Sequence, residues 1–265
     1  MLDVDAYLVA GAALAAAAIS GWLISLVKQD VSIVDALWSP MFLVMLLVYL
    51  ALAERLGSRA ELVLSLVAVW AIRLSAHIVW RNRGQPEDRR YRQIRSNNEP
   101  YFAIKSLYIV FGLQAALAWA IGLPLVAAAT SQAPLNVLDH AGVGLWLVGF
   151  FFEALGDLQL ARFKRNPENS ARVLDRGLWA YTRHPNYFGE FVIWWGYFLI
   201  ALGAGAWWSI FAPLLMTILL VKVSGVALLE SDIGTRRPEY VAYMRSVNAF
   251  FPGPRKRLSG ADTAS

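Results

Sequence analysis

The sequence has no cysteine among its 265 residues and only three histidines. Without cysteine, the chain has no disulfide framework, no thiolate metal site and no cysteine nucleophile. His77, His140 and His184 are too far apart for the spacings of helical zinc motifs, so we expect no metal site. Charged residues are scarce as well, at 16% of the chain against 58% hydrophobic residues.

Long apolar runs are what the sequence has instead. Several approach the ~20 residues that an α-helix needs to cross a bilayer. They predict an all-α, polytopic membrane protein with about seven spans, at 6–27, 31–53, 61–80, 101–129, 141–161, 186–204 and 206–228. The first run lacks a basic leading region and is too long for a signal peptide, so we expect it to be retained.

We expect one membrane domain over residues 1–253, with a cofactor-binding half mainly at 141–253, and a disordered tail at 254–265 whose composition is polar and basic. No internal repeat of the transporter type is evident.

The basic residues are concentrated in two connections, 81–100 and 162–183, and in the C-terminal tail. The connections near 130–140 and 202–207 have no Lys or Arg, so the positive-inside rule places the basic loops and the C-terminus in the cytoplasm and the N-terminus outside. Arg55 and Arg59 are exceptions to this pattern. The abundance of Ala and of Arg over Lys suits a bacterial inner membrane protein.

Membrane topology accounts for most of the net charge of +5, and no nucleic-acid module accompanies it, so we expect no nucleic-acid partner. Membrane lipids and an anionic cofactor remain candidate partners. Nothing indicates an obligate protein partner.

Ionisable residues inside the predicted spans are costly unless they are paired or hydrated, at ~2.5 kcal/mol or more near the bilayer centre. They are Asp35, Arg73, His77, Glu153, Asp157, Glu190 and Lys222. Glu153 and Asp157 are four residues apart and share a helix face. Each residue alone can form a structural ion pair, but their gathering toward one side of the membrane favours a ligand pocket.

The segment "LARFKRNPENSARVLDRGLWAYTRHPNYFGE" combines cations, amides and aromatic rings. Guanidinium groups bind phosphate oxygens in a fork, carboxylates accept from ribose hydroxyls, and aromatic rings stack on bases. The segment therefore suits a phosphorylated, ring-containing ligand; the alternative is a solvated basic loop. Because no dinucleotide fingerprint or Walker motif is present, a nucleotide site must be built among membrane helices. Pro185 suits the first position of a helix, whose N-terminal amides would lie beside His184 and Asn186.

The string "RHPNYFGE", with "SIVDALW", "WRNRGQPEDRRYRQIR", "FFFEALGDLQLARFK" and "PEYVAYMRSVNAFFP", resembles the steroid 5-alpha-reductase family, specifically its bacterial branch of unassigned function. The resemblance covers about nine tenths of the chain. It implies a seven-helix bundle that holds NADPH in a cytoplasmic-side cavity. It also implies hydride transfer to a carbon–carbon double bond conjugated to a carbonyl in a lipid-like substrate, such as a steroid or another enone.

Carried over by position, the resemblance assigns cofactor contacts to Asn82, Asp157, Lys164, Arg172, Asn186 and Glu190. Tyr181, Arg183 and His184 are expected as neighbours of the cofactor, together with Arg162 of the same basic segment. Steroid-reducing members polarise the substrate carbonyl with a Gln-Glu pair and a Tyr. Here Asp35 stands for the Glu, Val34 replaces the Gln, and the stretch "AVWAIRLSAH" has no Tyr.

The candidate proton donors are therefore Asp35, Arg73 and His77. Burial could keep Asp35 protonated, whereas an ion pair with Arg73 would keep it charged; the sequence leaves both open.

Two other functions compete with the reductase. Isoprenylcysteine carboxyl methyltransferases and phospholipid methyltransferases, which bind S-adenosylmethionine, resemble the C-terminal region through the R-H-P-x-Y string and the later "EYVAYMRSV" segment. A lipid-binding relative without catalysis is the third possibility. The Asn82 motif, the Gly-Asp pair at 156–157 and the basic loop favour the reductase.

Overall fold

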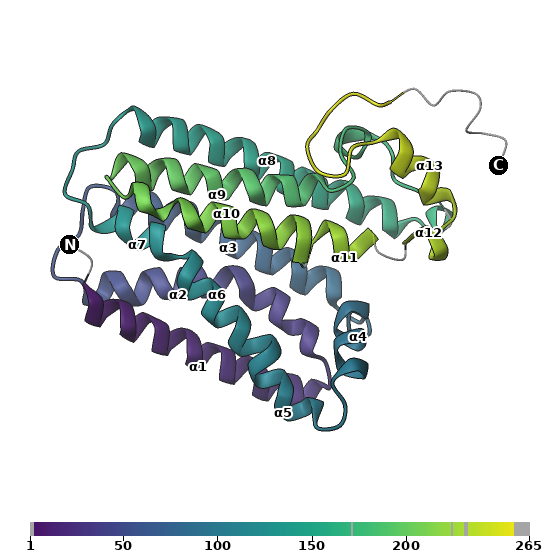
Figure 1. Ribbon diagram of the computed structural model, residues 1–265, viewed down its shortest axis with the longest axis horizontal. Helices are drawn as coiled ribbons and strands as arrows, with labels where there is room; N and C mark the ends of the chain where they lie inside the picture. The colour runs from purple at the N-terminus through teal and green to yellow at the C-terminus, as the bar shows by residue number, and fades with distance from the viewer. Residues whose placement is uncertain (1–2, 171, 224, 231–232, 257–265) are drawn as a thin grey trace. The chain divides into compact units, whose positions relative to one another are not determined.

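The computed structural model describes residues 3–170, 172–223, 225–230 and 233–256 (Figure 1). Its regular structure is helical, which confirms the predicted fold class. The chain forms two compact units: residues 1–139 with 200–212, and residues 140–199 with 213–265. Of the tail predicted to be disordered, 257–265 lies outside the described residues.

The helices follow one another along the chain, with a long connection, residues 166–184, between α8 and α9. The first seven are α1 Val4–Lys28, α2 Val34–Leu52, α3 Ala60–Asn82, α4 Arg89–Asn97, α5 Phe102–Ser106, α6 Leu113–Ile121 and α7 Leu123–Thr130. The others are α8 Val137–Arg165, α9 Pro185–Gly203, α10 Phe211–Ile218, α11 Val226–Glu230, α12 Ile233–Arg236 and α13 Glu239–Ser246. Short π-helical segments at Leu107–Gly112 and Leu219–Val223 continue α5 and α10.

Six helical stretches in the described part of the chain are long and apolar enough to cross a membrane: Val4–Lys28, Val31–Leu52, Ala60–Asn82, Phe102–Thr130, Val137–Arg165 and Trp207–Thr235. They confirm that the chain is an integral membrane protein, and they correspond to six of the seven predicted spans. The exception is 186–204, which forms the helix α9 but is not among the six. Asn186, Glu190 and a set of Trp and Tyr side chains lie among its strongly apolar residues.

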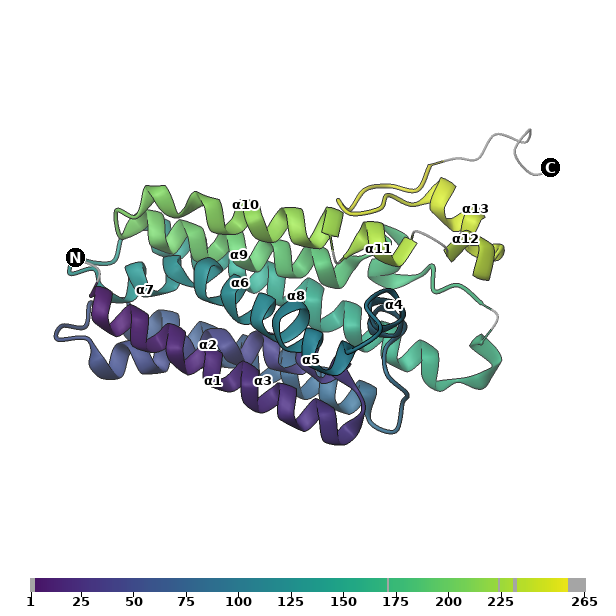
Figure 2. The same ribbon diagram turned by 60° about the horizontal axis from the view of Figure 1, so that its bottom comes forward.

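In the first unit, α1, α2 and α6 run side by side (Figure 1 and Figure 2), and α3 packs against α2. The buried face of α1 is a stripe of mostly small residues, which allows neighbouring helices to approach closely. Tyr7 and Trp119 join α1 to α6: their rings stack at 4.8 Å, and each side chain donates a hydrogen bond to the carbonyl of the other residue.

Arg59 is the residue directly before α3, and its side chain binds other segments of the first unit. Its guanidinium forms a bidentate ion pair with Asp139, at 2.6 and 2.8 Å, and donates to the carbonyls of Ala133, Pro134 and Gly203. Arg59 is fully buried and Asp139 nearly so. Arg59 is an exception to the positive-inside pattern of the loops. The structure explains it, because this cation is buried and paired with Asp139.

In the second unit, α8 and α9 pack along glycines spaced seven residues apart on each helix (Figure 1). A Cβ atom at Gly189 would lie 2.4 Å from the backbone nitrogen of Glu153, and one at Gly149 would lie 2.6 Å from the carbonyl oxygen of Gly189. The two backbones therefore touch where any side chain would separate them. This contact sets Glu153 and Asp157 of α8 beside the first turns of α9.

Candidate functional sites

Asp35, in the first turn of α2, is the centre of a polar cluster in the first unit. Its Oδ2 atom accepts a hydrogen bond from Arg90 at 2.6 Å, and its Oδ1 atom accepts one from the hydroxyl of Tyr91 at 2.5 Å. Gln114 of α6 donates to the same hydroxyl at 3.3 Å. Both carboxylate oxygens of Asp35 are therefore held by residues of α4.

α4 forms because its ends are fixed by local hydrogen bonds. Asp88 caps the helix by accepting from the backbone nitrogen of Arg90 at 2.9 Å. Glu87 accepts from the backbone nitrogen of Val31 at 2.9 Å and forms a bidentate pair with Arg95, at 2.8 and 3.1 Å. These contacts attach a nine-residue helix to the start of α2, where the sequence predicted only a basic loop.

Tyr91 is the one buried residue of α4. Burial raises the pKa of its hydroxyl well above the usual value, and the negative charge of Asp35 raises it further. Tyr91 therefore keeps its proton at neutral pH. Tyr91 was not predicted, because the resemblance implies a tyrosine in the third span. A tyrosine inside an arginine-rich, amphipathic segment of nine residues was the available signal.

Arg73 and His77, the other candidate proton donors, lie on α3. Hydrogen bonds join α3 to α2 close to Asp35 in the sequence. Ser75 donates to the carbonyl of Ala36 at 2.8 Å, and Ser39 donates to the carbonyl of Ala71 at 3.1 Å. The structure thus brings Asp35, Arg73 and His77 onto two adjacent helices. Asn82, a predicted cofactor contact, is the last residue of α3 and accepts a hydrogen bond from Arg81.

In the second unit, Arg183 and His184 both bind Glu230. Arg183 forms a bidentate ion pair with this carboxylate, 2.7 Å for each contact, and the Nε2 atom of His184 lies 2.9 Å from it. Arg183 also donates to the carbonyls of Met244 and Val247. These contacts join the start of α9 to the end of α11 and to the C-terminal segment.

The charge of Arg183 is well stabilised in this position. Burial lowers its pKa, but the hydrogen bonds and the charge of Glu230 outweigh burial and raise the pKa above the usual value. Arg183 and His184, predicted as neighbours of a cofactor, are in this structure contacts of Glu230. Glu230 was not among the predicted residues; an acidic side chain directly after the last apolar run was the available signal.

Asp157 and Asn186 form the second polar pair of this unit. The amide of Asn186 donates to the carboxylate of Asp157 at 3.1 Å, between α8 and the first turn of α9. Trp179 packs beside them and donates to the carbonyl of Gly156 at 3.1 Å. Glu190 lies one helical turn after Asn186 and is buried. Three predicted cofactor contacts, Asp157, Asn186 and Glu190, are therefore neighbours along the packed faces of α8 and α9.

The remaining predicted cations are exposed at the end of α8 and in the loop that follows it. The exposed set consists of Arg162, Lys164, Arg165, Arg172 and Arg176. The guanidinium groups of the four arginines make no hydrogen bond or ion pair with the described residues. Arg165 and Arg176 were not singled out from the sequence, although they lie in the same basic segment. Tyr181 is 54% exposed, so its ring is accessible.

The predicted site residues are thus divided between the two units. Asp35, Arg73, His77 and Asn82 lie in the first unit, and the other predicted cofactor contacts lie in the second. No group of three or more His, Asp and Glu side chains within the described residues is arranged to hold a metal ion.

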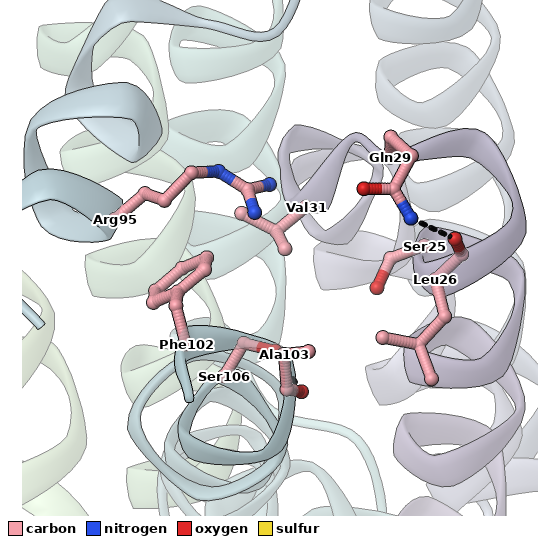
Figure 3. Close-up of a pocket in the computed structure, with 8 residues that line it drawn as sticks. All are labelled: Ser25, Leu26, Gln29, Val31, Arg95, Phe102, Ala103 and Ser106. Carbon is pink, nitrogen blue, oxygen red and sulfur yellow. Dashed lines mark hydrogen bonds between the residues drawn. The ribbon is translucent and has the colours of Figure 1, made fainter. Parts of the chain in front are cut away.

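A small hollow in the first unit lies between the end of α1, α5 and Arg95 (Figure 3). The guanidinium of Arg95 lies 4.6 Å from the ring centroid of Phe102 and is bound by Glu87. Gln29 turns back to the carbonyl of Leu26 at 2.6 Å. None of the predicted site residues lines the hollow, and its charged group is already paired within the protein.

Comparison with curated proteins found no match, and comparison with solved structures found none either. A family model matches residues 21–247, which include every predicted site residue. The chain therefore belongs to the family described as protein of unknown function (DUF1295).

Proposed function

We propose that this membrane protein is an NADPH-dependent reductase that transfers a hydride to a carbon–carbon double bond conjugated to a carbonyl in a lipid-like substrate. The observation that supports the proposal most is a set of exposed arginines whose guanidinium groups have no hydrogen bond or ion pair with the described residues. Arg162, Arg165, Arg172 and Arg176 leave their donors available at the end of α8 and in the following loop.

The chemistry of these groups fits the parts of NADPH. Guanidinium groups bind phosphate oxygens in a bidentate fork, and NADPH carries two bridging phosphates and a 2′-phosphate. The carboxylate of Asp157, which accepts from Asn186, is of the type that accepts hydrogen bonds from ribose hydroxyls. The exposed ring of Tyr181 can stack on a base. Lys164 adds a further cation in the same segment.

NADPH would supply the hydride; the chain must supply a proton donor for the oxygen of the substrate carbonyl. Asp35, Arg73 and His77 remain our candidates, and Tyr91 joins them. Because its pKa is raised, Tyr91 holds its proton until negative charge develops on a nearby oxygen. Rotation of its O–H bond away from Asp35 would deliver the proton, while Arg90 continues to neutralise the carboxylate.

The proposal includes a location. The two arginine-rich connections, 81–100 and 162–183, would face the cytoplasm of a bacterial cell, where NADPH is available, and the protein would lie in the inner membrane.

A methyltransferase that uses S-adenosylmethionine is the second candidate. A set of hydrogen bonds favours it, because the R-H-P-x-Y string and the "EYVAYMRSV" segment, whose combination resembles the methyltransferases, pack together. Arg183 donates to the carbonyls of Met244 and Val247, and Tyr243 donates to the carbonyl of Trp179 at 2.6 Å. S-adenosylmethionine has no phosphate and would leave the exposed arginines without a role.

Thermal stabilisation of the detergent-purified protein by NADPH, NADH and S-adenosylmethionine tests the two candidates directly. A ligand at a hundred times its Kd adds about 2.7 kcal/mol to the free energy of unfolding. We expect a clear rise of the unfolding temperature with NADPH and a smaller one with NADH at the same concentration. A rise with S-adenosylmethionine alone would refute the reductase and support the methyltransferase.

A further inference from the structure

We infer that α4 and the turn before it form a binding surface for the headgroups of anionic phospholipids, through Arg83 and Arg92. The inference does not depend on the proposed reductase function, because it concerns a different connection and a different ligand.

The position of α4 is the first argument. α3 and the helical stretch that begins at Phe102 are both membrane-spanning in length and composition, and α4 lies in the connection between them. The bonds from Arg90 and Tyr91 to Asp35 and the bond from Glu87 to Val31 hold α4 against the start of α2 (Figure 1). The helix is therefore fixed at one end of the spanning helices and does not extend freely into water.

The distribution of charge is the second argument. Residues 81–100 contain six arginines and three acidic residues, so their net charge is +3. Two of the acids are used within the protein: Glu87 pairs with Arg95, and Asp88 pairs with Arg90. Arg83 and Arg92 are exposed, and their guanidinium groups make no hydrogen bond or ion pair with the described residues. Part of the excess positive charge thus lies on Arg83 and Arg92, whose guanidinium groups are available to contact a ligand.

The neighbouring aromatic residues are the third argument. Trp80, at the end of α3, is 53% exposed, and Tyr101, just before α5, is 74% exposed. Trp and Tyr side chains gather at the level of the lipid headgroups, where one part of the ring is apolar and the other polar. They indicate that the connection lies in the headgroup layer, where guanidinium groups meet phosphates.

A lipid surface fits better than a single soluble molecule. A small ligand is normally bound in a concave site that covers most of its surface, whereas Arg83 and Arg92 are exposed. The nearby hollow of Figure 3 is lined by Arg95, whose charge Glu87 already neutralises. A basic side chain close to an anionic membrane contributes about 1 kcal/mol, which corresponds to about 5-fold in affinity for each arginine.

The test is a titration of the full-length protein with phosphatidylglycerol in uncharged detergent micelles, read by native mass spectrometry. We expect phosphatidylglycerol to bind more tightly than phosphatidylcholine. R83Q combined with R92Q should weaken phosphatidylglycerol binding about 25-fold, and each single variant about 5-fold. R55Q combined with R245Q removes the same charge from two other exposed positions, and it should retain binding within about 2-fold of the unmodified protein.

Three further measurements complete the test. R83K combined with R92K keeps both charges and should retain most of the binding, which separates lost charge from lost folding. Added salt should weaken binding to the unmodified protein more than to the R83Q/R92Q variant. Equal losses in the two charge-removing double variants, or no preference for phosphatidylglycerol, would overturn the inference. Displacement of the lipid by NADPH or inorganic phosphate would also overturn it, because the two arginines would then bind a soluble phosphate.

Discussion

Tyr91 donates a hydrogen bond of 2.5 Å to Asp35, which lies 56 residues earlier in the chain. The bond joins the surface helix α4 to the first turn of α2, and Arg90 binds the second oxygen of the same carboxylate. A buried phenol, an acidic side chain and a guanidinium are thus combined at one end of the first unit. This combination either positions a proton donor or attaches α4 to the bundle, and two substitutions distinguish the two roles.

The first substitution is Tyr91→Phe, which keeps the ring and removes the hydroxyl. We expect the free energy of unfolding to fall by about 1.5–3 kcal/mol, because a hydrogen bond to a charged group is lost. If Tyr91 is the proton donor, turnover of an enone substrate falls by about 100-fold or more while the affinity for NADPH is unchanged. Steady-state kinetics and a cofactor titration measure both quantities. Unchanged turnover at full occupancy would leave Tyr91 with the attachment role alone.

The second substitution is Asp35→Asn, which keeps the shape of the side chain and removes its charge. If Asp35 acts on the substrate, directly or through the hydrogen-bonded Tyr91, turnover should fall with little change in cofactor affinity. Arg90→Gln is the matched control, since it removes the other member of the ion pair and leaves the bond between Tyr91 and Asp35 in place. A large loss of NADPH affinity in Asp35→Asn would contradict the assignment.

The Arg59–Asp139 ion pair predicts a large effect on stability. Asp139→Asn should lower the free energy of unfolding by about 3–5 kcal/mol, because it leaves the fully buried charge of Arg59 uncompensated. Thermal unfolding in detergent measures the loss. Glu54→Gln is a suitable control, since Glu54 is an exposed acid in the same region. Equal stability of the two variants would show that the ion pair contributes little.

The packing of α8 against α9 gives a matched pair of glycine substitutions. Gly189→Ala should destabilise the protein by about 1–3 kcal/mol, because the added Cβ atom would lie 2.4 Å from the backbone nitrogen of Glu153. Gly144→Ala, on α8, has no heavy atom within 4 Å of its added Cβ and should leave stability unchanged or slightly raised. The difference between the two unfolding temperatures is the measurement. Similar temperatures would mean that the two helices do not touch at Gly189.

Arg172 tests the assignment of the basic loop to NADPH. If its guanidinium binds the 2′-phosphate, Arg172→Ala weakens NADPH binding by about 10-fold or more, since a charge-assisted hydrogen bond is lost, and it changes NADH binding little. Arg245→Ala removes an exposed arginine of α13 and serves as the control. Equal losses for the two cofactors would remove Arg172 from the phosphate site.

The all-helical membrane fold could be predicted from the sequence because the length and apolarity of a spanning helix are local properties. Six of the seven predicted spans agree with helices of spanning length and composition. The helix α9 differs because its first turn carries polar side chains that contact α8, such as Asn186, which donates to Asp157. The types of side chain available for a phosphate-bearing ligand could also be read from the sequence, because positive charge and aromatic content do not depend on tertiary contacts.

The pairing of those side chains was decided only by the tertiary structure. The sequence offered Arg73 as a partner of Asp35, whereas α4 folds back and places Arg90 and Tyr91 there. The same holds for Arg183 and His184, which bind Glu230 nearly fifty residues later. An ion pair forms between groups that the chain path brings within about 3 Å, and separation along the sequence does not determine that distance. Composition alone therefore identified which charges are present, and the fold determined which of them are paired and which are left free for a ligand.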